Sequence, residues 1–509
     1  MRAKKTLKNL IFNFLQQFVA IITNFIIPPL IIGNFGSSIN GLVSTIKQIT
    51  NHAQLTGAGI SSVSTYAMYK PLSEKDTKKL NGIYSATNKM FIKAGNLFTL
   101  ILVIVAVIYP CFVNGDINYF VTGALVIIIG INGLSEFYLV GKYQSLLNAD
   151  QKNFVIAIAQ MLGNIFNVII TIILIKLKQG IIVVQLGAAM IYVLRVTILN
   201  IYIKRNYKYL NKGEKPLMNE LSQRNDAIIH SVTDLIINSS ATVIVSIFCG
   251  LEAASIYAVY ALVFAGINTI CSIVSNAIYA SFGEVIAKND DKVLKSSYNI
   301  YEWIYLIFVS IIFSVAALII LPFVKVYTKN VADINYILPA LAGLFIAIGY
   351  INNLKIPART LVTAAGHFKQ TKNRSLIELI LNLTGQLIFV QFFGIYGALI
   401  GAVLSYVYRT IDFINYSNKK ILFINNKRSI YRIIINVLIG AILVFTIGNI
   451  ATIECNNYIE LLISAAIVTI VVGLTYLIIN YFIEKDAFKE TINIIKAIFK
   501  KGKSVEEKC

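Results

Sequence analysis

Two stretches of the chain, 214 positions apart, decide the fold. Residues 180–195 read GIIVVQLGAAMIYVLR, and residues 394–409 read GIYGALIGAVLSYVYR. The two stretches share Gly, Ile, Gly-Ala, Tyr-Val and Arg in register. The same offset, to within one residue, places Lys142 on Lys355. A shared offset over distant segments predicts an internal repeat, so the chain is expected to contain two similar halves.

The composition excludes a soluble protein. The 509 residues are 57% hydrophobic and 14% charged, whereas an average soluble domain is about 45–50% apolar and about 25% charged. Apolar runs of about twenty residues recur along the chain, and each is long enough to cross the hydrocarbon core as a helix. Fourteen such spans are expected, which predicts an all-α polytopic membrane protein. No small-residue cleavage site precedes Gly33, so the first span is expected to be retained.

The repeat divides the chain into two lobes of six helices each. We expect an N-terminal lobe over residues 1–203, a basic cytoplasmic linker over 204–225 and a C-terminal lobe over 226–418. Six is an even number of spans, so the two copies are expected to have the same orientation in the membrane. Two extra helices follow over 419–483. Apolar residues at helical spacing among lysines then predict an amphipathic cytoplasmic tail over 484–509.

Basic residues assign the two sides of the membrane. The chain has 45 Lys and Arg against 24 Asp and Glu, a formal net charge of +21. Six of the 45 lie inside spans, and the loops on one side hold only four: Lys176, Lys178, Lys325 and Lys329. Cytoplasmic loops carry the excess of Lys and Arg. Both termini are therefore expected in the cytoplasm, in a protein of the cytoplasmic (inner) membrane, and the net charge does not indicate nucleic acid.

The sequence does not predict an enzyme. It contains no Walker loop, no dinucleotide fingerprint and no His/Cys cluster. The five cysteines have no paired spacing, so neither a disulfide framework nor a metal site is expected. The adjacent acids Asp290 and Asp291 alternate with lysines, which is typical of a solvated face. No cofactor is expected.

Six cations inside the spans are the candidate substrate-binding residues. A charged side chain at mid-membrane costs about 2.5–3.5 kcal/mol on insertion scales, so each requires a partner or a water-filled cavity. The six residues are Lys47, Lys142, Arg195, Lys355, Arg359 and Arg409. A cavity between the lobes lined by these cations would bind an anion, and phosphate or pyrophosphate suits both guanidinium and ammonium groups.

Structural alternatives stay open for most of these cations. Three of them lie near enough to the inner face to snorkel: Lys142, Lys355 and Arg359. Arg195 and Arg409 can instead pair with acids, and Asp412 stands three residues after Arg409. Lys47 lies too deep to snorkel easily, which favours a role in the cavity.

Polar and acidic side chains inside spans give further candidates. Asn13 and Gln17 in the first span, and Asn51 and His52 near Lys47, are expected to line the cavity; packing against neighbouring helices is the alternative. The first span has no acid. The best candidate for coupling transport to a cation is then Asp234.

Short motifs in the first two spans and in two later loops carry a family resemblance. In order, they are Lys8-Asn9-Leu10, Pro28-Pro29-Leu30, Phe35-Gly36-Ser37, Asn40-Gly41-Leu42, Gly59-Ile60, Tyr69-Lys70-Pro71-Leu72, Leu147–Lys152 and Ala364–Thr371. This series resembles bacterial polysaccharide exporters of the oligosaccharide flippase family, within the multidrug/oligosaccharidyl-lipid/polysaccharide exporter superfamily. The resemblance extends over most of residues 5–415.

The resemblance implies a V-shaped fold of two six-helix lobes and a substrate. That substrate is an undecaprenyl-pyrophosphate-linked oligosaccharide repeat unit, carried across the cytoplasmic membrane by alternating access for surface polysaccharide such as O-antigen or exopolysaccharide. A polysaccharide polymerase and glycosyltransferases are the implied partners, and a monomer is favoured. In one departure, many relatives read Asn-Thr-Asp where this chain has Asn238-Ser239-Ser240. Ion coupling is therefore absent here or carried by Asp234.

Two other function classes remain. A cation-coupled multidrug exporter of the same superfamily would alter drug resistance and leave surface polysaccharide intact. A scaffold for a polysaccharide assembly complex would need its basic loops but not the cations inside its spans.

Overall fold

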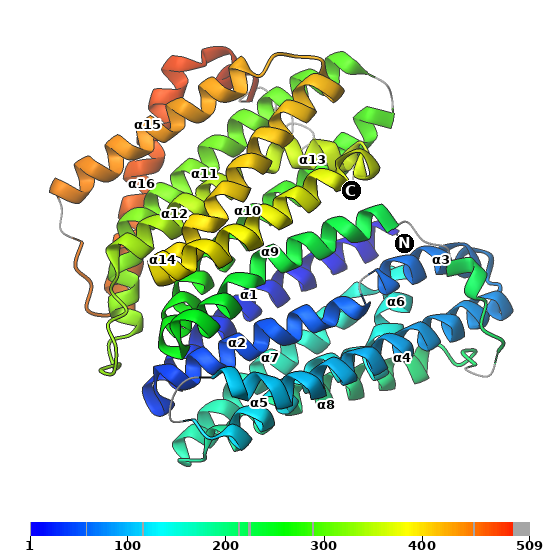
Figure 1. Cartoon of the computed structure of the whole chain (residues 1–509). Helices are drawn as coiled ribbons and strands as arrows, with labels where there is room; N and C mark the ends of the chain where they lie inside the picture. Colours follow the sequence, from blue (N-terminus) through cyan, green and yellow to red (C-terminus); the bar gives the residue numbers. More distant parts are fainter. Residues whose placement is uncertain are drawn as a thin grey trace. The chain divides into compact units, whose positions relative to one another are not determined.

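The computed structural model describes residues 2–57, 59–113, 117–211, 214–221, 225–287, 290–450 and 453–491 (Figure 1). All regular elements within these ranges are helices, which confirms the expected all-α class. Most of the predicted amphipathic tail, residues 492–509, lies outside the described residues.

The long helices follow one another along the chain in two sets. The first set is α1 (Arg2–Phe35), α2 (Ser37–Ala53), α3 (Ile60–Glu74), α4 (Thr77–Ile108), α5 (Tyr119–Ser135), α6 (Gly141–Ala149), α7 (Asn153–Lys176) and α8 (Ile181–Asn206). The second set is α9 (Asn225–Cys249), α10 (Leu251–Ala287), α11 (Asp291–Tyr327), α12 (Pro339–Leu354), α13 (Ile356–Ala364), α14 (Phe368–Tyr416), α15 (Lys427–Ile450) and α16 (Tyr458–Ile483). Short helical turns lie between them, including a π-turn, η3 (Glu136–Val140), and a 3-10 turn, η4 (Met218–Leu221).

The described helices account for the fourteen predicted spans. Twelve segments are long and apolar enough to cross a membrane. One of them, Phe368–Leu422, contains two predicted spans, because Gly394 has φ 55° and ψ −135° and breaks α14 into two helical halves. The predicted second span, 40–68, is formed by α2 and α3, which meet near Gly59 at φ 80°. A positive φ favours glycine, since it has no Cβ to collide with the backbone.

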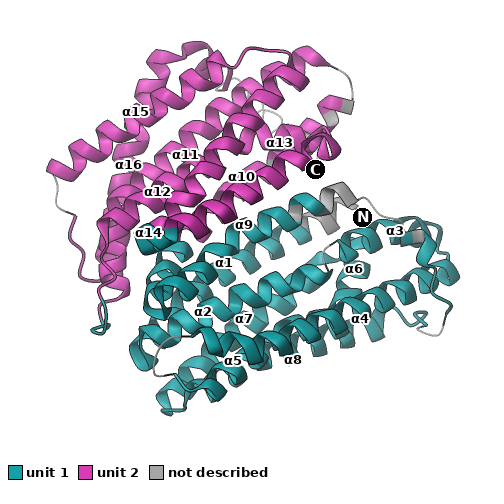
Figure 2. Ribbon diagram, in the orientation of Figure 1, with its two compact units in different colours: residues 1–262, 330–334, 390–395 teal, residues 263–329, 335–389, 396–509 magenta. Residues whose placement is uncertain are grey.

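The chain folds into two compact units, which Figure 2 colours separately. Unit 1 comprises residues 1–262, 330–334 and 390–395, and unit 2 comprises 263–329, 335–389 and 396–509. Helices α1 to α9 therefore belong to unit 1, and α11, α12, α13, α15 and α16 belong to unit 2. The predicted division of the repeat at residues 204–225 stays a prediction.

In unit 1 the start of α1 is fixed by polar contacts. The Asn9 side chain donates to the Gln151 carbonyl at 2.9 Å and accepts from the Phe154 N–H at 2.9 Å. The Lys8 ammonium lies 3.8 Å from the centre of the Phe154 ring. Helix α1 then packs along α7 and α2. These contacts explain why a helix with few buried side chains keeps its place in the unit.

Helices α2 and α10 meet at a glycine. A Cβ on Gly41 would lie 1.8 Å from the Leu251 carbonyl oxygen, so the two backbones touch. One residue earlier, the Asn40 amide donates to the Ser255 hydroxyl at 2.7 Å. In lipid the hydrophobic effect does not drive helices together. Membrane helices associate instead through close backbone approach at small residues and through interhelical hydrogen bonds.

In unit 2 the two extra helices are attached to α11 through Arg432. Its guanidinium lies 3.0 Å from Glu302 of α11 and 2.5 Å from Glu484, which follows α16. It also donates to the Asn299 side chain at 2.7 Å. Arg432 is 2% exposed. Sequence reasoning counted it among the loop cations and missed this buried network.

We predict that Gly41→Ala destabilises unit 1. The added methyl must push α2 away from the Leu251 carbonyl, and overpacking of this kind typically costs about 1–3 kcal/mol. Thermal unfolding of the purified protein in detergent measures the effect. Gly33→Ala is the matched control, since a Cβ there meets no atom within 4 Å. Equal unfolding temperatures for the two variants would contradict the close contact.

Candidate functional site

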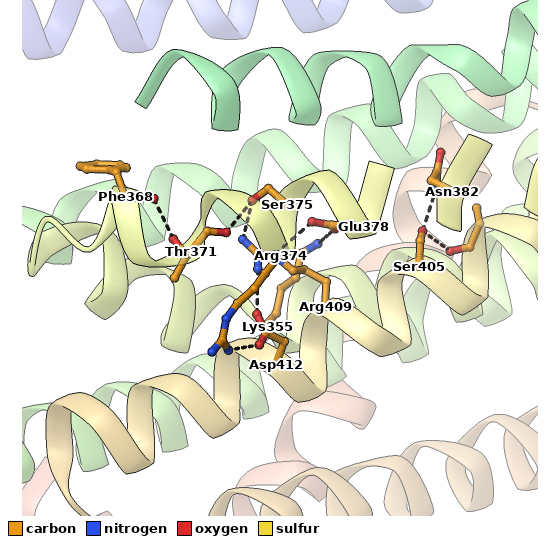
Figure 3. Close-up of polar contacts among 11 residues, drawn as sticks. Lys355, Phe368, Thr371, Arg374, Ser375, Glu378, Asn382, Ser405, Arg409 and Asp412 are labelled. Carbon is orange, nitrogen blue, oxygen red and sulfur yellow. Dashed lines mark hydrogen bonds and ion pairs between the residues drawn. The ribbon is translucent and has the colours of Figure 1, made fainter. Parts of the chain in front are cut away.

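Arg409 lies in a buried network of charges on α14 (Figure 3). Its Nε is 3.1 Å from Glu378, its Nη1 is 2.7 Å from Asp412, and its Nη2 donates to the Ser375 hydroxyl at 2.7 Å. The guanidinium carbon lies 3.9 Å from the centre of the Phe413 ring. The side chain is 1% exposed. Two carboxylates therefore compensate one guanidinium away from water.

Lys355 enters the same network from the break between α12 and α13. Its ammonium donates to Glu378 at 2.8 Å and lies 5.0 Å from the centre of the Tyr406 ring. Glu378 thus bridges Lys355 and Arg409, while Arg374 pairs with Asp412. These ion pairs join three cations to two acids: Lys355, Arg374, Arg409, Glu378 and Asp412. The formal charges of these five side chains sum to +1.

The broken helix α14 is what brings these residues together. Past Gly394 the second half of α14 runs back along the first, because residue pairs approach in reverse order: Gly385 with Gly401, Asn382 with Ser405, and Glu378 with Arg409. A Cβ on Gly401 would lie 2.2 Å from the Gly385 carbonyl carbon. The close glycine pair therefore places the carboxylate of one half within reach of the guanidinium of the other.

Arg195 occupies the matching position in unit 1, in a looser network. Its Nη2 lies 3.4 Å from Glu136, at the start of the π-turn η3, and Gln144 donates to the same carboxylate oxygen at 3.3 Å. The acid comes from a different place in each copy of the repeat. Position 164, which is 214 before Glu378, is Asn. The repeat thus preserves the arginine but not its partner.

Lys142, which the predicted repeat aligns with Lys355, contacts an amide, a backbone carbonyl and an aromatic ring. Its ammonium donates to the Asn88 side chain at 2.9 Å and to the Tyr138 carbonyl at 3.4 Å, and it lies 5.5 Å from the centre of the Tyr143 ring. Arg359 is half-buried on α13, one turn after Lys355. The cavity role predicted for these cations stays a prediction. For Lys142, Arg195, Lys355 and Arg409, the structure adds the ion pairs or hydrogen bonds that a ligand would have to displace.

Lys47 differs from these cations. It is exposed on α2, and within the described ranges its ammonium has no ion pair and no hydrogen bond. Asn51, one turn later, is also exposed, and its amide lies 3.5 Å from Gln48. The exposed face of α2 therefore presents a single uncompensated positive charge beside an amide.

The other predicted polar residues lie on α2 or on helices that pack against it. On α1, Asn13 is half-buried and Gln17 is exposed one turn later. His52 accepts or donates a hydrogen bond with Ser239 of α9 at 3.1 Å, so it joins α2 to α9. Asp234, half-buried, lies on α9. Helix α2 packs against both α1 and α9, which gathers these predicted residues in unit 1.

Comparison with solved structures identifies the fold. A multidrug resistance MATE family transporter of the MOP superfamily, inward-facing, matches with TM-score 0.64 and 12% identity over 80% of this chain and 98% of that chain. The lipid II flippase MurJ, inward closed, matches with TM-score 0.63 and 16% identity over 93% and 99%. A MOP superfamily transporter from Pyrococcus furiosus matches with TM-score 0.51 and 15% identity over 82% and 95%.

This chain has the fold of those transporters. The expected fold class is therefore confirmed. No protein-family model matches the sequence, and a search of curated proteins finds no match. Membership of the polysaccharide exporter family itself stays a prediction.

We predict that Arg409→Ala destabilises unit 2 strongly. Removing the guanidinium leaves Glu378 and Asp412 with less compensation, and breaking a buried ion pair from one side typically costs about 3–5 kcal/mol. Arg195→Ala is expected to have a smaller effect, because Arg195 meets one carboxylate at 3.4 Å. Unfolding in detergent measures both changes. Lys369→Ala, an exposed cation on α14, is the control; an Arg409→Ala variant as stable as this control would contradict a structural ion pair.

Proposed function

We propose that the chain is a flippase that translocates undecaprenyl-pyrophosphate-linked oligosaccharide repeat units across the cytoplasmic membrane. The observation that carries the proposal is the uncompensated ammonium of Lys47 on the exposed face of α2. A charge placed within a membrane span and without an acid partner requires water or an anionic ligand. The pyrophosphate group supplies such an anion.

The pairing of the other cations makes Lys47 the first contact in this proposal. Arg195 and Arg409 bind phosphate only after giving up contacts with Glu136, Glu378 or Asp412. A compact ammonium offers three donors without that loss. One free cation also binds weakly enough to release the cargo, which a transporter must do in every cycle.

The amides near Lys47 suit the glycan part of the cargo. Asn51 on α2 and Gln17 on α1 are exposed, and Asn13 is half-buried. Amide side chains both donate and accept hydrogen bonds, as sugar hydroxyls do. In the proposed mechanism these residues contact the sugars while the lipid tail stays in the bilayer, and the two lobes alternate between inward- and outward-open states.

The comparison with MurJ supports a lipid-linked cargo. That protein is described as a lipid II flippase, and the match extends over 93% of this chain, against 80% for the inward-facing MATE transporter. The polysaccharide polymerase and glycosyltransferases are partners in the same proposal.

Export measured in cells tests the function. We expect Lys47→Ala to abolish or strongly reduce export of lipid-linked sugar at unchanged protein level, because the phosphate contact is lost. Lys47→Arg is expected to restore much of the export, since it keeps the charge. Lys89→Ala, an exposed cation on α4, is the control and is expected to export normally. Wild-type export by Lys47→Ala would overturn the proposed contact.

A cation-coupled multidrug exporter is the second candidate, and the half-buried carboxylate of Asp234 on α9 favours it. For this function we expect a deletion strain to change its drug susceptibility and to keep its surface polysaccharide. Transport by Asp234→Asn would then lose its dependence on the proton or sodium gradient, because the Asn amide has no negative charge with which to bind H⁺ or Na⁺. Lost polysaccharide with unchanged drug susceptibility would instead exclude this candidate.

A further inference from the structure

A cavity of about 400 Å³ lies in unit 1, away from Lys47. It is open on one side and is lined by residues from the first part of α4, from α6, from the end of α8 and from the segment that follows α8. The lining residues are Tyr84, Tyr143, Asn200, Ile203, Lys204, Tyr207, Lys208 and Leu210. Neither the predicted cavity cations nor the predicted polar lining includes any of them.

Hydrogen bonds hold two walls of this cavity in place. The Tyr207 hydroxyl donates to Asp150 at 2.6 Å, and Lys152 pairs with the same carboxylate at 2.7 Å. The Tyr143 hydroxyl donates to the Asn200 side chain at 3.2 Å. These rings are therefore positioned before any ligand arrives, and Asp150 is compensated by its own partners.

The segment after α8 folds back on α4 and forms part of the cavity wall. The Asn81 side chain donates to the Tyr209 carbonyl at 3.0 Å and accepts from the Asn211 N–H at 3.1 Å. Further on, the Leu217 N–H donates to the Gly82 carbonyl at 3.1 Å, and a Cβ on Gly82 would lie 2.7 Å from the Leu217 side chain. The start of the linker between the two predicted lobes is thus part of the cavity wall.

Three lining residues of the cavity have polar groups that suit an anion: Tyr84, Lys204 and Lys208. Lys204 and Lys208 are exposed and form no ion pair with any described acid. The Tyr84 side chain is 1% exposed, and its hydroxyl has no hydrogen-bond partner among the residues that the structure describes. Two ammonium groups and a phenol hydroxyl can each donate a hydrogen bond to a phosphate oxygen. Ile203 and Leu210 add an apolar wall.

We propose that this cavity binds a phosphate group and thereby fastens the linker segment to unit 1. The site is separate from the proposed cargo contact and does not depend on the proposed function. Basic pockets between helices at the cytoplasmic membrane surface are suited to lipid head groups. A phosphate ester of an inner-leaflet lipid and a soluble phosphate share the required chemistry, so the two sources are separated by experiment.

Hydrogen exchange of the full-length protein in nanodiscs tests the proposal. One set of nanodiscs contains phosphatidylglycerol, and the other contains only uncharged diglucosyl diacylglycerol, to which inorganic pyrophosphate is then added. We expect a phosphate source to slow exchange of the backbone amides after α8, including that of Asn211. Slowing by phosphatidylglycerol identifies a lipid as the source, and slowing by pyrophosphate in uncharged nanodiscs identifies a soluble phosphate.

Paired variants distinguish a built site from general surface charge. The double variant Lys204→Ala/Lys208→Ala is expected to raise the half-saturating concentration about tenfold, since each lost charge-assisted bond weakens binding. Tyr84→Phe is expected to weaken binding, because it removes the hydroxyl and keeps the aromatic ring. Arg205→Ala, an exposed cation of the same helix end outside the cavity lining, is expected to bind as the wild type does. Absence of slowing with both sources, or an equal effect of Arg205→Ala and the double variant, would overturn the proposal.

Discussion

A charge inside a membrane span needs a partner in the protein, water or a bound ligand, and this constraint organises both units. In unit 2, Glu378 meets this need for Lys355 and Arg409 at once, and so it ties the break between α12 and α13 to both halves of α14. In unit 1, Glu136 pairs with Arg195 across η3 and α8. In water a hydrophobic core holds helices together. Lipid provides no such driving force, so these ion pairs help to connect the helices instead.

The internal repeat constrains the two copies unequally. Arg195 and Arg409 stand 214 positions apart, yet their acids come from unrelated positions. Among the described residues, Arg195 meets one carboxylate and Arg409 meets two. The looser network of unit 1 also contains a π-turn at Glu136. A π-turn widens the helix and leaves backbone groups less regularly bonded, and such turns are frequent at functional sites. The two copies thus share their cations and differ in how firmly these are held.

The sequence predicts the spans well because length and apolarity are local properties. The boundary between the apolar runs 375–393 and 394–416 predicts the division of α14 at Gly394. The repeat predicts that Arg195 and Arg409 occupy matching positions. Partners were harder to predict, since they depend on which helices meet. Asp412 was expected beside Arg409 from its spacing, but Glu378 becomes a partner only when α14 folds back on itself. The cavity beside Tyr84 required the linker segment to return to α4, which no local pattern indicates.

The tie between α11 and the extra helices bears on how the chain is made. Glu302 enters the membrane with α11, but Arg432 is synthesised 130 residues later. By contrast, Glu378 is synthesised only 23 residues after its partner Lys355. During that interval the Glu302 carboxyl lacks its guanidinium partner, and α11 must insert on its own apolarity. Among the candidate spans of the described residues, the one formed by α11 contains the most apolar window. The high apolarity of α11 therefore offsets the cost of inserting the Glu302 carboxyl into the membrane before Arg432 is synthesised.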